Sequence, residues 1–393
     1  MPFHVSLNWK TLFVTATVPL LALALHVRAR ACTAVFVVSG GAVLVGNNED
    51  ASMPLTKMWV VSGEPGKYNR FYLGYANDQT IQGGINERGL WFDSFSAEPK
   101  PVVSTPGATV FDGDMHDKIM AECATVEEAV ELLHRYNLPF LADNMLMLGD
   151  RTGASVIVEG NAILPRRGSY QIITNFRQSE HPEGSNFDAR YKIAETMLKA
   201  DPHVSVESIR KILAAVHQEG QTSTVYSYIC DLQSLKLYLY HFHNFENVVI
   251  LDLHQEFAKG SHTQNLRELF PTTFAAEQFV SQSVAALEAM KAEHRYLPFD
   301  PKTYADFVGR YTVQSPPSMA GREVIVIAAP DRLRAELKDG VLRELIPEST
   351  VKFSVWEPDQ RGTYVTFLRD PSGIVTGFVA DTASGLISAT KMK

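Results

Sequence analysis

Cysteine is scarce in this chain, with three residues in 393. Three cysteines are too few for the disulfide framework of a small secreted scaffold. Basic charge is also in short supply, because 36 Lys and Arg stand against 44 Asp and Glu and give a formal charge of −8. A chain without a basic excess has no electrostatic footprint for nucleic acid. The composition, 45% hydrophobic and 20% charged, is typical of a soluble globular protein.

The N-terminal apolar run is too short, and is followed too closely by basic residues, to indicate a membrane span. Residues 11–27 (TLFVTATVPLLALALHV) are followed at once by Arg28 and Arg30. The small residues of Ala29-Arg30-Ala31 stand where a signal peptidase reads its substrate. The sequence therefore predicts a signal peptide over residues 1–31, cut before Cys32. We expect an exported protein, periplasmic or extracellular, with no stable membrane insertion after cleavage.

Such a cut would place Cys32 at the head of the mature chain. Its thiol could then pass a proton to its own α-amine, whose ordinary pKa is about 8, so that nucleophile and base belong to one residue. Two other interpretations remain open, a plain structural thiol and a lipoprotein acylation site, although Ala29 stands where a lipobox has Leu. Cys123 and Cys230 are predicted to be buried thiols, with a single bridge between them left open.

The hydrophobic patterns predict an α+β fold, in which two groups of strands alternate with pairs of helices. Stacked sheets covered by helices satisfy this order. We expect strands at 33–38, 42–46, 57–62, 70–75, 80–85, 90–95, 144–148, 155–159, 170–174, 224–230, 236–242 and 248–252. We expect two helices within 111–135 and further helices at 190–199, 206–217 and 272–294. Thr125 is expected to cap the second helix, with Glu128 completing a capping box.

The C-terminal part is predicted to be a separate domain. After a linker at 296–301 (YLPFDP), short strands alternate with turns at 338–340, 358–362 and 370–373, a spacing typical of a small all-β barrel or sandwich. The segments 307–311 (FVGRY) and 373–378 (GIVTGF) resemble the lipocalin-like domain appended to some serine β-lactamase-like hydrolases. The predicted domains are 1–31, 32–294 and 302–393.

Four short motifs follow one another after the predicted cut. They are Cys32-Thr33 with a hairpin leading to 46–50 (GNNED), 86–90 (NERGL), Thr174-Asn175 and 189–191 (ARY). In this order they resemble the choloylglycine hydrolase and penicillin V acylase family, linear amide hydrolases of the N-terminal nucleophile class, over about 32–252. The resemblance implies a four-layer αββα core.

The resemblance also implies roles for single residues. Cys32 would be the nucleophile, Asp50 the acidic residue that holds it, and Arg190 the cation beside it, which we expect to favour the thiolate. Asn175 and the backbone N–H of Ser96 would stabilise the oxyanion of a tetrahedral intermediate.

One position departs from the family pattern. Asn47 replaces an arginine, and either hydrogen-bonds substrate or the cysteine, or is a solvated strand-end residue. This departure bears on the substrate preference more than on the reaction type.

The predicted activity is hydrolysis of a linear amide C–N bond in a small-molecule substrate through a thioester on Cys32. Acyl transfer to a second amine and a lipid-anchored, non-enzymatic binding protein are the alternatives. Self-association into a homo-oligomer is compatible with the sequence. No cofactor and no metal are implied: His241-Phe242-His243 would put two imidazoles on one strand face, but without an evident third ligand it is interpreted as a polar strand face.

Overall fold

The computed structural model describes residues 32–52, 55–75, 81–111, 114–181, 188–201, 203–220, 222–293, 299–315, 319–329, 332–337, 342–356, 364–382 and 385–392. The signal peptide predicted over 1–31, with its cleavage pattern, lies outside the described residues, as do the predicted turns at 338–340 and 358–362.

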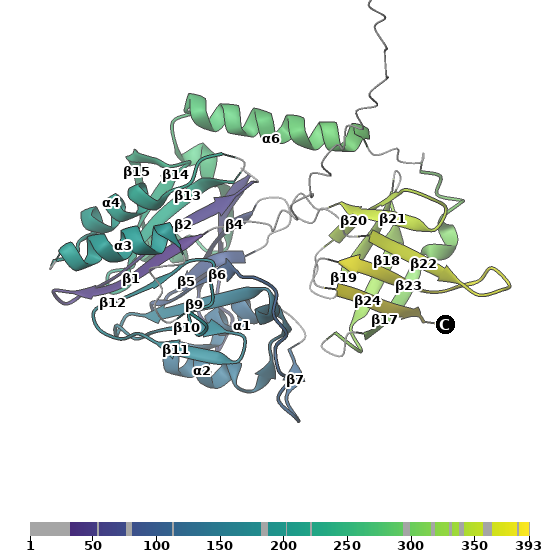
Figure 1. Cartoon of the computed structure of the whole chain (residues 1–393), viewed down its shortest axis with the longest axis horizontal. Coiled ribbons are helices and arrows are strands. Elements are labelled where there is room, and N and C mark those ends of the chain that lie inside the picture. Colours follow the sequence, from purple (N-terminus) through teal and green to yellow (C-terminus); the bar gives the residue numbers. More distant parts are fainter. Residues whose placement is uncertain are drawn as a thin grey trace, which may run out of the picture.

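Two antiparallel sheets form the larger unit (Figure 1). The first sheet has the strand order β12-β1-β2-β13-β14-β15. Its strands are β1 (Thr33–Ser39), β2 (Ala42–Ala51), β12 (Tyr170–Ile173), β13 (Ser223–Asp231), β14 (Lys236–His241) and β15 (Asn244–Asp252). The predicted strands and the 33–46 hairpin are confirmed, except that β15 begins at Asn244 instead of 248 and β2 continues to Ala51 instead of ending at Gly46. It does so because β13 pairs with it along its whole second half, which satisfies backbone groups that would otherwise be buried without partners.

The second sheet has the order β11-β10-β9-β6-β5-β4-β3-β16. Its strands are β3 (Thr56–Val61), β4 (Arg70–Tyr75), β5 (Ile81–Asn86), β6 (Leu90–Ser96), β9 (Asn144–Asp150), β10 (Ser155–Glu159), β11 (Ala162–Pro165) and β16 (His262–Asn265). Strands β11 and β16 were not predicted; they are four residues each and lie at the two edges of the sheet.

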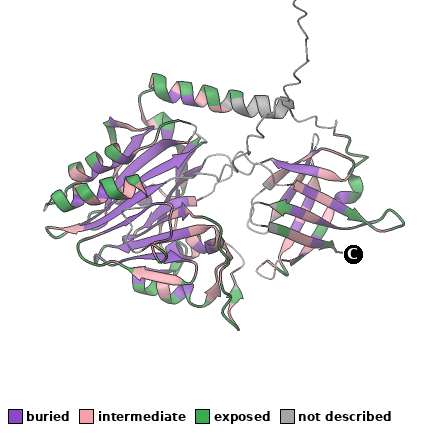
Figure 2. Ribbon diagram, viewed as in Figure 1, coloured by how far each residue is buried: buried purple, intermediate pink, exposed green. Residues whose placement is uncertain are grey.

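The main core fills the space between the two sheets. Strand β1 shows how alternation builds it, because Ala34 and Phe36 belong to the cluster between the sheets while Val35 and Val37 belong to the cluster on the other face. Both faces of the strand are buried (Figure 2), so the sequence is apolar without interruption instead of alternating with polar residues.

Pairs of helices cover the outer faces. Helices α3 (Ala189–Ala200) and α4 (Val206–Val216) pack on the first sheet, and α1 (Met115–Glu122) and α2 (Val126–Leu133) on the second. The predicted αββα layering is therefore confirmed. Thr125 caps α2 by accepting the Glu128 backbone N–H, as expected, but the Glu128 carboxylate accepts from the Ala124 N–H instead of closing the box on Thr125.

Helix α4 lies unusually close to β2. A Cβ placed on Gly46 would stand 2.4 Å from Ile209 Cγ2, so only glycine permits this approach. Asn48 then donates from Nδ2 to the Leu213 carbonyl at 2.9 Å and accepts from the Ser227 hydroxyl at 2.7 Å. These contacts fix the end of α4 against the strand that carries Asp50.

A closed eight-stranded barrel follows, as the predicted all-β unit requires (Figure 1). Its strands are β17 (Gly309–Ser315), β18 (Glu323–Ala328), β19 (Leu333–Leu337), β20 (Leu342–Pro347), β21 (Lys352–Trp356), β22 (Tyr364–Arg369), β23 (Val375–Thr382) and β24 (Gly385–Lys391). It has its own core, in which the Phe307 and Phe367 rings stack at 4.3 Å. The domain limits given above stay predictions.

The remaining elements connect these layers. They are β7 (Thr109–Val110), β8 (Tyr136–Asn137), α5 (Leu253–Ala258), the 20-residue α6 (Phe274–Glu293), and 3₁₀ helices at Pro139–Ala142, Leu266–Leu269 and Ala305–Phe307. Within the described part of the chain, no helix combines the length and apolarity that a membrane span needs. Cys32, Cys123 and Cys230 are all buried free thiols, so Cys123 and Cys230 are not bridged.

Candidate active site

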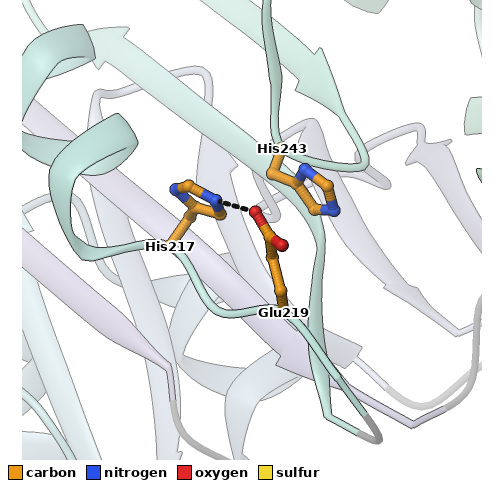
Figure 3. Close-up of side chains that lie close together, drawn as sticks. All are labelled: His217, Glu219 and His243. Atoms are coloured by element: carbon orange, nitrogen blue, oxygen red, sulfur yellow. Dashed lines mark hydrogen bonds and ion pairs between the residues drawn. The ribbon is translucent and has the colours of Figure 1, made fainter. Parts of the chain in front are cut away.

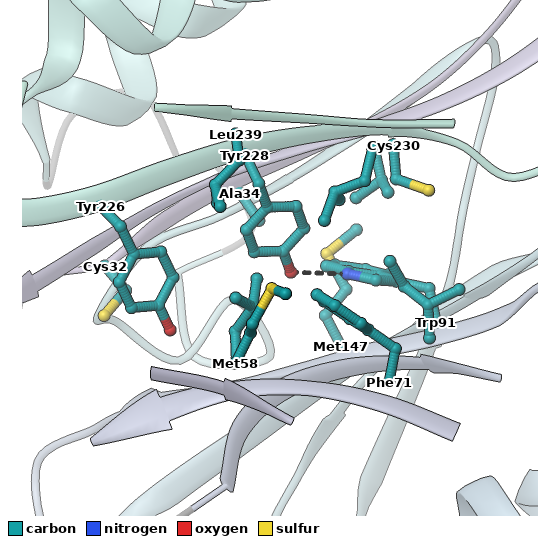
Figure 4. Close-up of a cluster of buried hydrophobic side chains, with 14 of the residues drawn as sticks. Cys32, Ala34, Met58, Phe71, Trp91, Met147, Tyr226, Tyr228, Cys230 and Leu239 are labelled. Carbon is teal, nitrogen blue, oxygen red and sulfur yellow. Dashed lines mark hydrogen bonds between the residues drawn. The ribbon is translucent and has the colours of Figure 1, made fainter. Parts of the chain in front are cut away.

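Cys32 stands immediately before β1 and is almost completely buried, with 2% of its surface exposed. Its side chain belongs to the cluster between the sheets, together with Tyr226 (Figure 4). Burial raises the pKa of the Cys32 thiol well above its ordinary value, and the carboxylates of Glu49 and Asp50 raise it further, while the Asp50 backbone N–H lowers it by donating to the sulfur. In the uncut chain the thiol is therefore protonated.

The expectation for Arg190 concerns the chain cut before Cys32 and stays a prediction. We expected the positive charge of Arg190 to favour the thiolate of Cys32. In the uncut chain desolvation has the largest effect on the pKa of the thiol, and the carboxylates of Glu49, Asp50 and Asp93 act in the same direction. A charged sulfur would have to give up its hydration in this layer, and these acids do not compensate for that loss.

Asp50 lies at the end of β2, on the face toward α3 and α4. Its carboxylate accepts hydrogen bonds from the Thr224 hydroxyl and from Gln218 Nε2, the latter at 2.6 Å. Arg190 Nη1 lies 3.5 Å from its Oδ2. Burial nevertheless dominates these contacts and raises the pKa of Asp50 from 3.8 to about 6. The residue lies beside Cys32, as predicted, but its contact with the thiol is made by the backbone N–H and not by the carboxylate.

Arg190 opens helix α3, where Asp188 is the N-cap and accepts the backbone N–H groups of Arg190 and Tyr191. The Asp188 carboxylate also pairs with the guanidinium at 2.7 Å, which holds the pKa of Asp188 below its usual value despite burial. Asp188 is thus both the N-cap of α3 and the residue that aims the Arg190 side chain.

The Arg190 guanidinium joins the predicted site residues. Its Nη1 donates to the Cys32 carbonyl and to Thr33 Oγ1, both at 3.2 Å, and its Nη2 donates to Asn175 Oδ1 at 3.2 Å. With the ion pair to Asp50, one planar cation contacts the start of β1, the end of β2 and the segment after β12. The fork of five N–H donors makes arginine suited to this task, whereas a lysine has a single ammonium.

Asn175 and Ser96, the two predicted oxyanion donors, lie next to each other. Asn175 Nδ2 donates to the Ser96 carbonyl at 2.8 Å, while its Oδ1 accepts from Arg190. Ser96 is the last residue of β6 and is paired with Asn144 of β9. The structure thus joins an amide from the first sheet to a strand end of the second.

Asn47 is not a solvated strand-end residue. It is fully buried on β2, and neither Nδ2 nor Oδ1 has a hydrogen-bond partner in the described structure. Alternation along β2 places it with Val45 on the face toward the second sheet, which is the Cys32 side. Two unpaired amide atoms in such a place are costly, so they mark a position where a ligand or water can bind.

Sequence reasoning missed an acidic pair in the same layer. Glu49 and Asp93 are fully buried; Glu49 accepts from the Tyr75 hydroxyl and Asp93 from the Tyr228 hydroxyl, each at 2.7 Å. Burial and the proximity of Glu49 raise the pKa of Asp93 well above its ordinary value. Period-two alternation could have revealed Glu49, because it follows Asn47 by two residues on a strand buried on both faces.

The two imidazoles expected on one strand face are not on one face. Phe242 and His243 form the turn between β14 and β15, with positive φ angles of 48° and 45°. His241 stacks on Phe270, whereas His243 stacks on His217. Of the described residues, His217, Glu219 and His243 are a group whose ligand atoms could hold a metal ion.

Comparisons with known proteins are limited to solved structures, since no protein family matches the chain and no curated protein matches its sequence. A mutant of conjugated bile acid hydrolase from Clostridium perfringens is similar at 15% identity and a TM-score of 0.49, over 62% of this chain and 97% of that one. Penicillin V acylase from Agrobacterium tumefaciens is similar at 16% identity and a TM-score of 0.44, over 60% and 91%.

The N-acylethanolamine-hydrolyzing acid amidase ortholog of Caenorhabditis elegans is similar at 15% identity and a TM-score of 0.39, over 51% of this chain and 93% of that one.

Proposed function

We propose that this chain is an exported cysteine amidase, activated by the cut before Cys32, that hydrolyses a linear amide C–N bond in a small molecule. The observation that carries the proposal is the set of Arg190 contacts. One partly buried guanidinium contacts the Cys32 carbonyl, Asn175 and Asp50, three residues that are distant in sequence and that the motifs had singled out. An arginine that served only in an ion pair would not also have to contact an asparagine amide and the backbone of Cys32.

The raised thiol pKa of the uncut chain supports activation by cleavage. A protonated thiol is a weak nucleophile. Removal of residue 31 leaves an α-amine on Cys32 that accepts the thiol proton, and the resulting ammonium partly offsets the carboxylates of Glu49 and Asp50. Burial of the thiol thereby keeps the precursor inactive.

Catalysis would then proceed in two steps. The Cys32 sulfur attacks the amide carbonyl, the carbon–nitrogen bond breaks, and the α-ammonium returns its proton to the departing amine, which leaves a thioester. Water next adds to the thioester, giving up its proton to the α-amine, and releases the carboxylic acid and the thiol. A donor aimed at the oxyanion in each addition is worth about 3 to 4 kcal/mol, and the Asn175 amide beside Ser96 is the residue suited to this task.

The layer between the sheets suggests how a substrate is held. Asn47 offers an amide with no protein partner among the described residues, on the same side of the first sheet as Cys32. It can donate to a polar group of the acyl substrate or accept from one. We propose that Asn47 selects a neutral hydrogen-bonding group, where an arginine in its place would select an anion.

The experiment is a screen with a defined control. The mature protein is identified by N-terminal sequencing and intact mass, then incubated with acyl amino acids, conjugated bile acids, penicillin V and acyl homoserine lactones. We expect a free Cys32 terminus, release of an amine from at least one class, and loss of about 1,000-fold or more in Cys32→Ser. Cys123→Ser, which removes a thiol from the helix-covered layer, should retain activity.

Three outcomes would contradict the proposal. They are a terminus other than Cys32, a diacylglyceryl mass on Cys32, which would indicate the lipid-anchored binding protein, and equal activity of Cys32→Ser. Adding a second amine separates hydrolysis from acyl transfer, because a transferase forms a new amide in place of the free acid.

A further inference from the structure

A second cluster of chemistry-bearing side chains lies beside the site, where α4 ends. His217 is the C-cap of α4, Glu219 follows two residues later, and His243 reaches it from the β14–β15 turn (Figure 3). One ligand atom from each lies within 4.8 Å of the other two. Ligand atoms on a tetrahedral zinc ion stand about 3.4 Å apart for metal–ligand distances near 2.1 Å, so small side-chain rotations suffice to close the group around a cation.

The hydrogen bonds of His217 leave a place for a positive charge. Its Nδ1 lies 2.6 Å from the Ala214 carbonyl, which can only accept, so Nδ1 carries a hydrogen. In a neutral imidazole Nε2 then presents a lone pair, yet Nε2 lies 3.0 Å from the Glu219 carboxylate, another acceptor. The two lone pairs repel unless a second proton or a metal ion stands between them. In metal sites a ligating histidine usually donates its other ring N–H to a carboxylate, a water or a backbone carbonyl, as His217 does here.

The backbone at His243 is held in an unfavourable conformation. A two-residue hairpin turn with positive φ at both positions favours Asn-Gly, but here it consists of Phe242 and His243, at 48° and 45°. Residues other than glycine are strained at such angles and persist there where the surroundings fix them. The conformation brings the His243 ring to 5.1 Å from that of His217, at 24° between the planes.

The cluster is open to solvent and connected to the candidate active site. The Glu219 side chain is 71% exposed and that of His217 26%, so an ion can enter without unfolding. Between them in sequence lies Gln218, whose Nε2 donates to Asp50 at 2.6 Å and whose backbone N–H donates to Thr224 Oγ1 at 2.9 Å. An ion held by the residues on both sides would fix the segment that carries Gln218.

We propose that His217, Glu219 and His243 form a binding site for one divalent transition-metal ion of the zinc class, with water completing the coordination. Two imidazoles and one carboxylate are a donor set that suits zinc. The site is separate from the thiol chemistry of Cys32 and does not depend on it. A protonated His217 paired with Glu219, without any metal, is the alternative that the experiment must distinguish.

The experiment titrates the untagged full chain, freed of metal with a chelator, with Zn²⁺ by calorimetry and with Co²⁺ by visible absorption. The variants are His243→Asn, whose asparagine tolerates the positive φ, and Glu219→Gln at an exposed position. His254→Asn is the matched control, because it removes an exposed histidine outside the cluster. Unfolding temperatures with and without Zn²⁺ give a second readout.

We expect one Zn²⁺ per chain, a cobalt spectrum of low coordination number, and a Zn²⁺-dependent rise in the unfolding temperature. Loss of a ligand should weaken Zn²⁺ binding by about 100-fold or more, since loss of a residue that only hydrogen-bonds a metal ligand already weakens metal binding 10- to 100-fold. The variant His254→Asn should bind Zn²⁺ like wild type. No saturable binding, a cobalt–thiolate charge-transfer band, or equal affinity in His243→Asn and His254→Asn would overturn the proposal.

Discussion

The raised pKa of Asp50 makes a quantitative prediction about stability. Burial raises this pKa from 3.8 to about 6, which corresponds to about 3 kcal/mol at 1.36 kcal/mol for each tenfold change in proton affinity. The native state therefore binds this proton more tightly than the unfolded state. The resulting stabilisation is fully present below pH 3.8 and is lost as the pH rises through about 6.

The perturbation is Asp50→Asn, which keeps the size of the side chain and removes its titration. The groups that face Asp50 are Arg190 from α3, His217 and Gln218 at the end of α4, and Thr224 on β13. These four residues are the same in the variant and in wild type, so their own effects on the unfolding free energy largely cancel when the two proteins are compared. The hydrogen bonds from Gln218 and Thr224 strengthen when Asp50 is ionised, and this pH dependence is already contained in its pKa of about 6.

The assay is urea unfolding of the uncut chain from pH 4 to pH 8. Trp59 and Trp91 are buried in the unit of two sheets and report on its unfolding, with Trp9 and Trp356 replaced by Phe to remove other signals. We expect the unfolding free energy of the variant, relative to that of wild type, to rise by about 2.4 kcal/mol between pH 4 and pH 7. A difference that stays flat, or that changes in the opposite direction, would refute the account of Asp50 as a buried carboxyl dominated by desolvation.

Three further predictions test the neighbouring contacts. Arg190→Ala should destabilise the protein by about 1 kcal/mol more at pH 7 than at pH 5, because the Asp50 carboxylate, whose pKa is about 6, then loses its partner and takes up a proton. Urea unfolding measures this difference, and an equal loss at both pH values would contradict the pairing. Gly149→Ala should lower the free energy of unfolding by about 1 to 3 kcal/mol, since the added Cβ would stand 2.3 Å from the Phe36 ring. Thermal or urea unfolding measures this loss, and an unchanged unfolding midpoint would mean that the ring moves freely. Cutting the chain before Cys32 should lower the pH midpoint of its alkylation, followed by peptide mass, because the new α-ammonium favours the thiolate; an identical midpoint in cut and uncut chains would argue against activation by cleavage.

The sequence alone determined the layers of this protein. Uninterrupted apolar runs at 33–38 and 42–46 with a glycine turn between them require a hairpin that is buried on both faces. Helical periodicity over 190–199 and 206–217 requires two helices that bury one side each. Packing these elements into stacked sheets with outer helices is the arrangement that removes their apolar faces from water.

The sequence also named the residues that the fold brings together around Arg190, because their motifs are short, local and ordered. It could not give their contacts. Which side of β2 carries Asn47 and which carries Asp50 depends on the register with β13, and the pKa of Asp50 depends on how much water the finished layers exclude.

Only the tertiary structure decided the two features that sequence patterns hid. Glu49 and Asp93 lie on strands of different sheets, and no local signal couples them. His217 and His243 are separated by a strand pair, and the local pattern around His243 indicated a strand where the chain turns. Contacts between residues distant in sequence arise from packing, and packing is set by the whole chain at once.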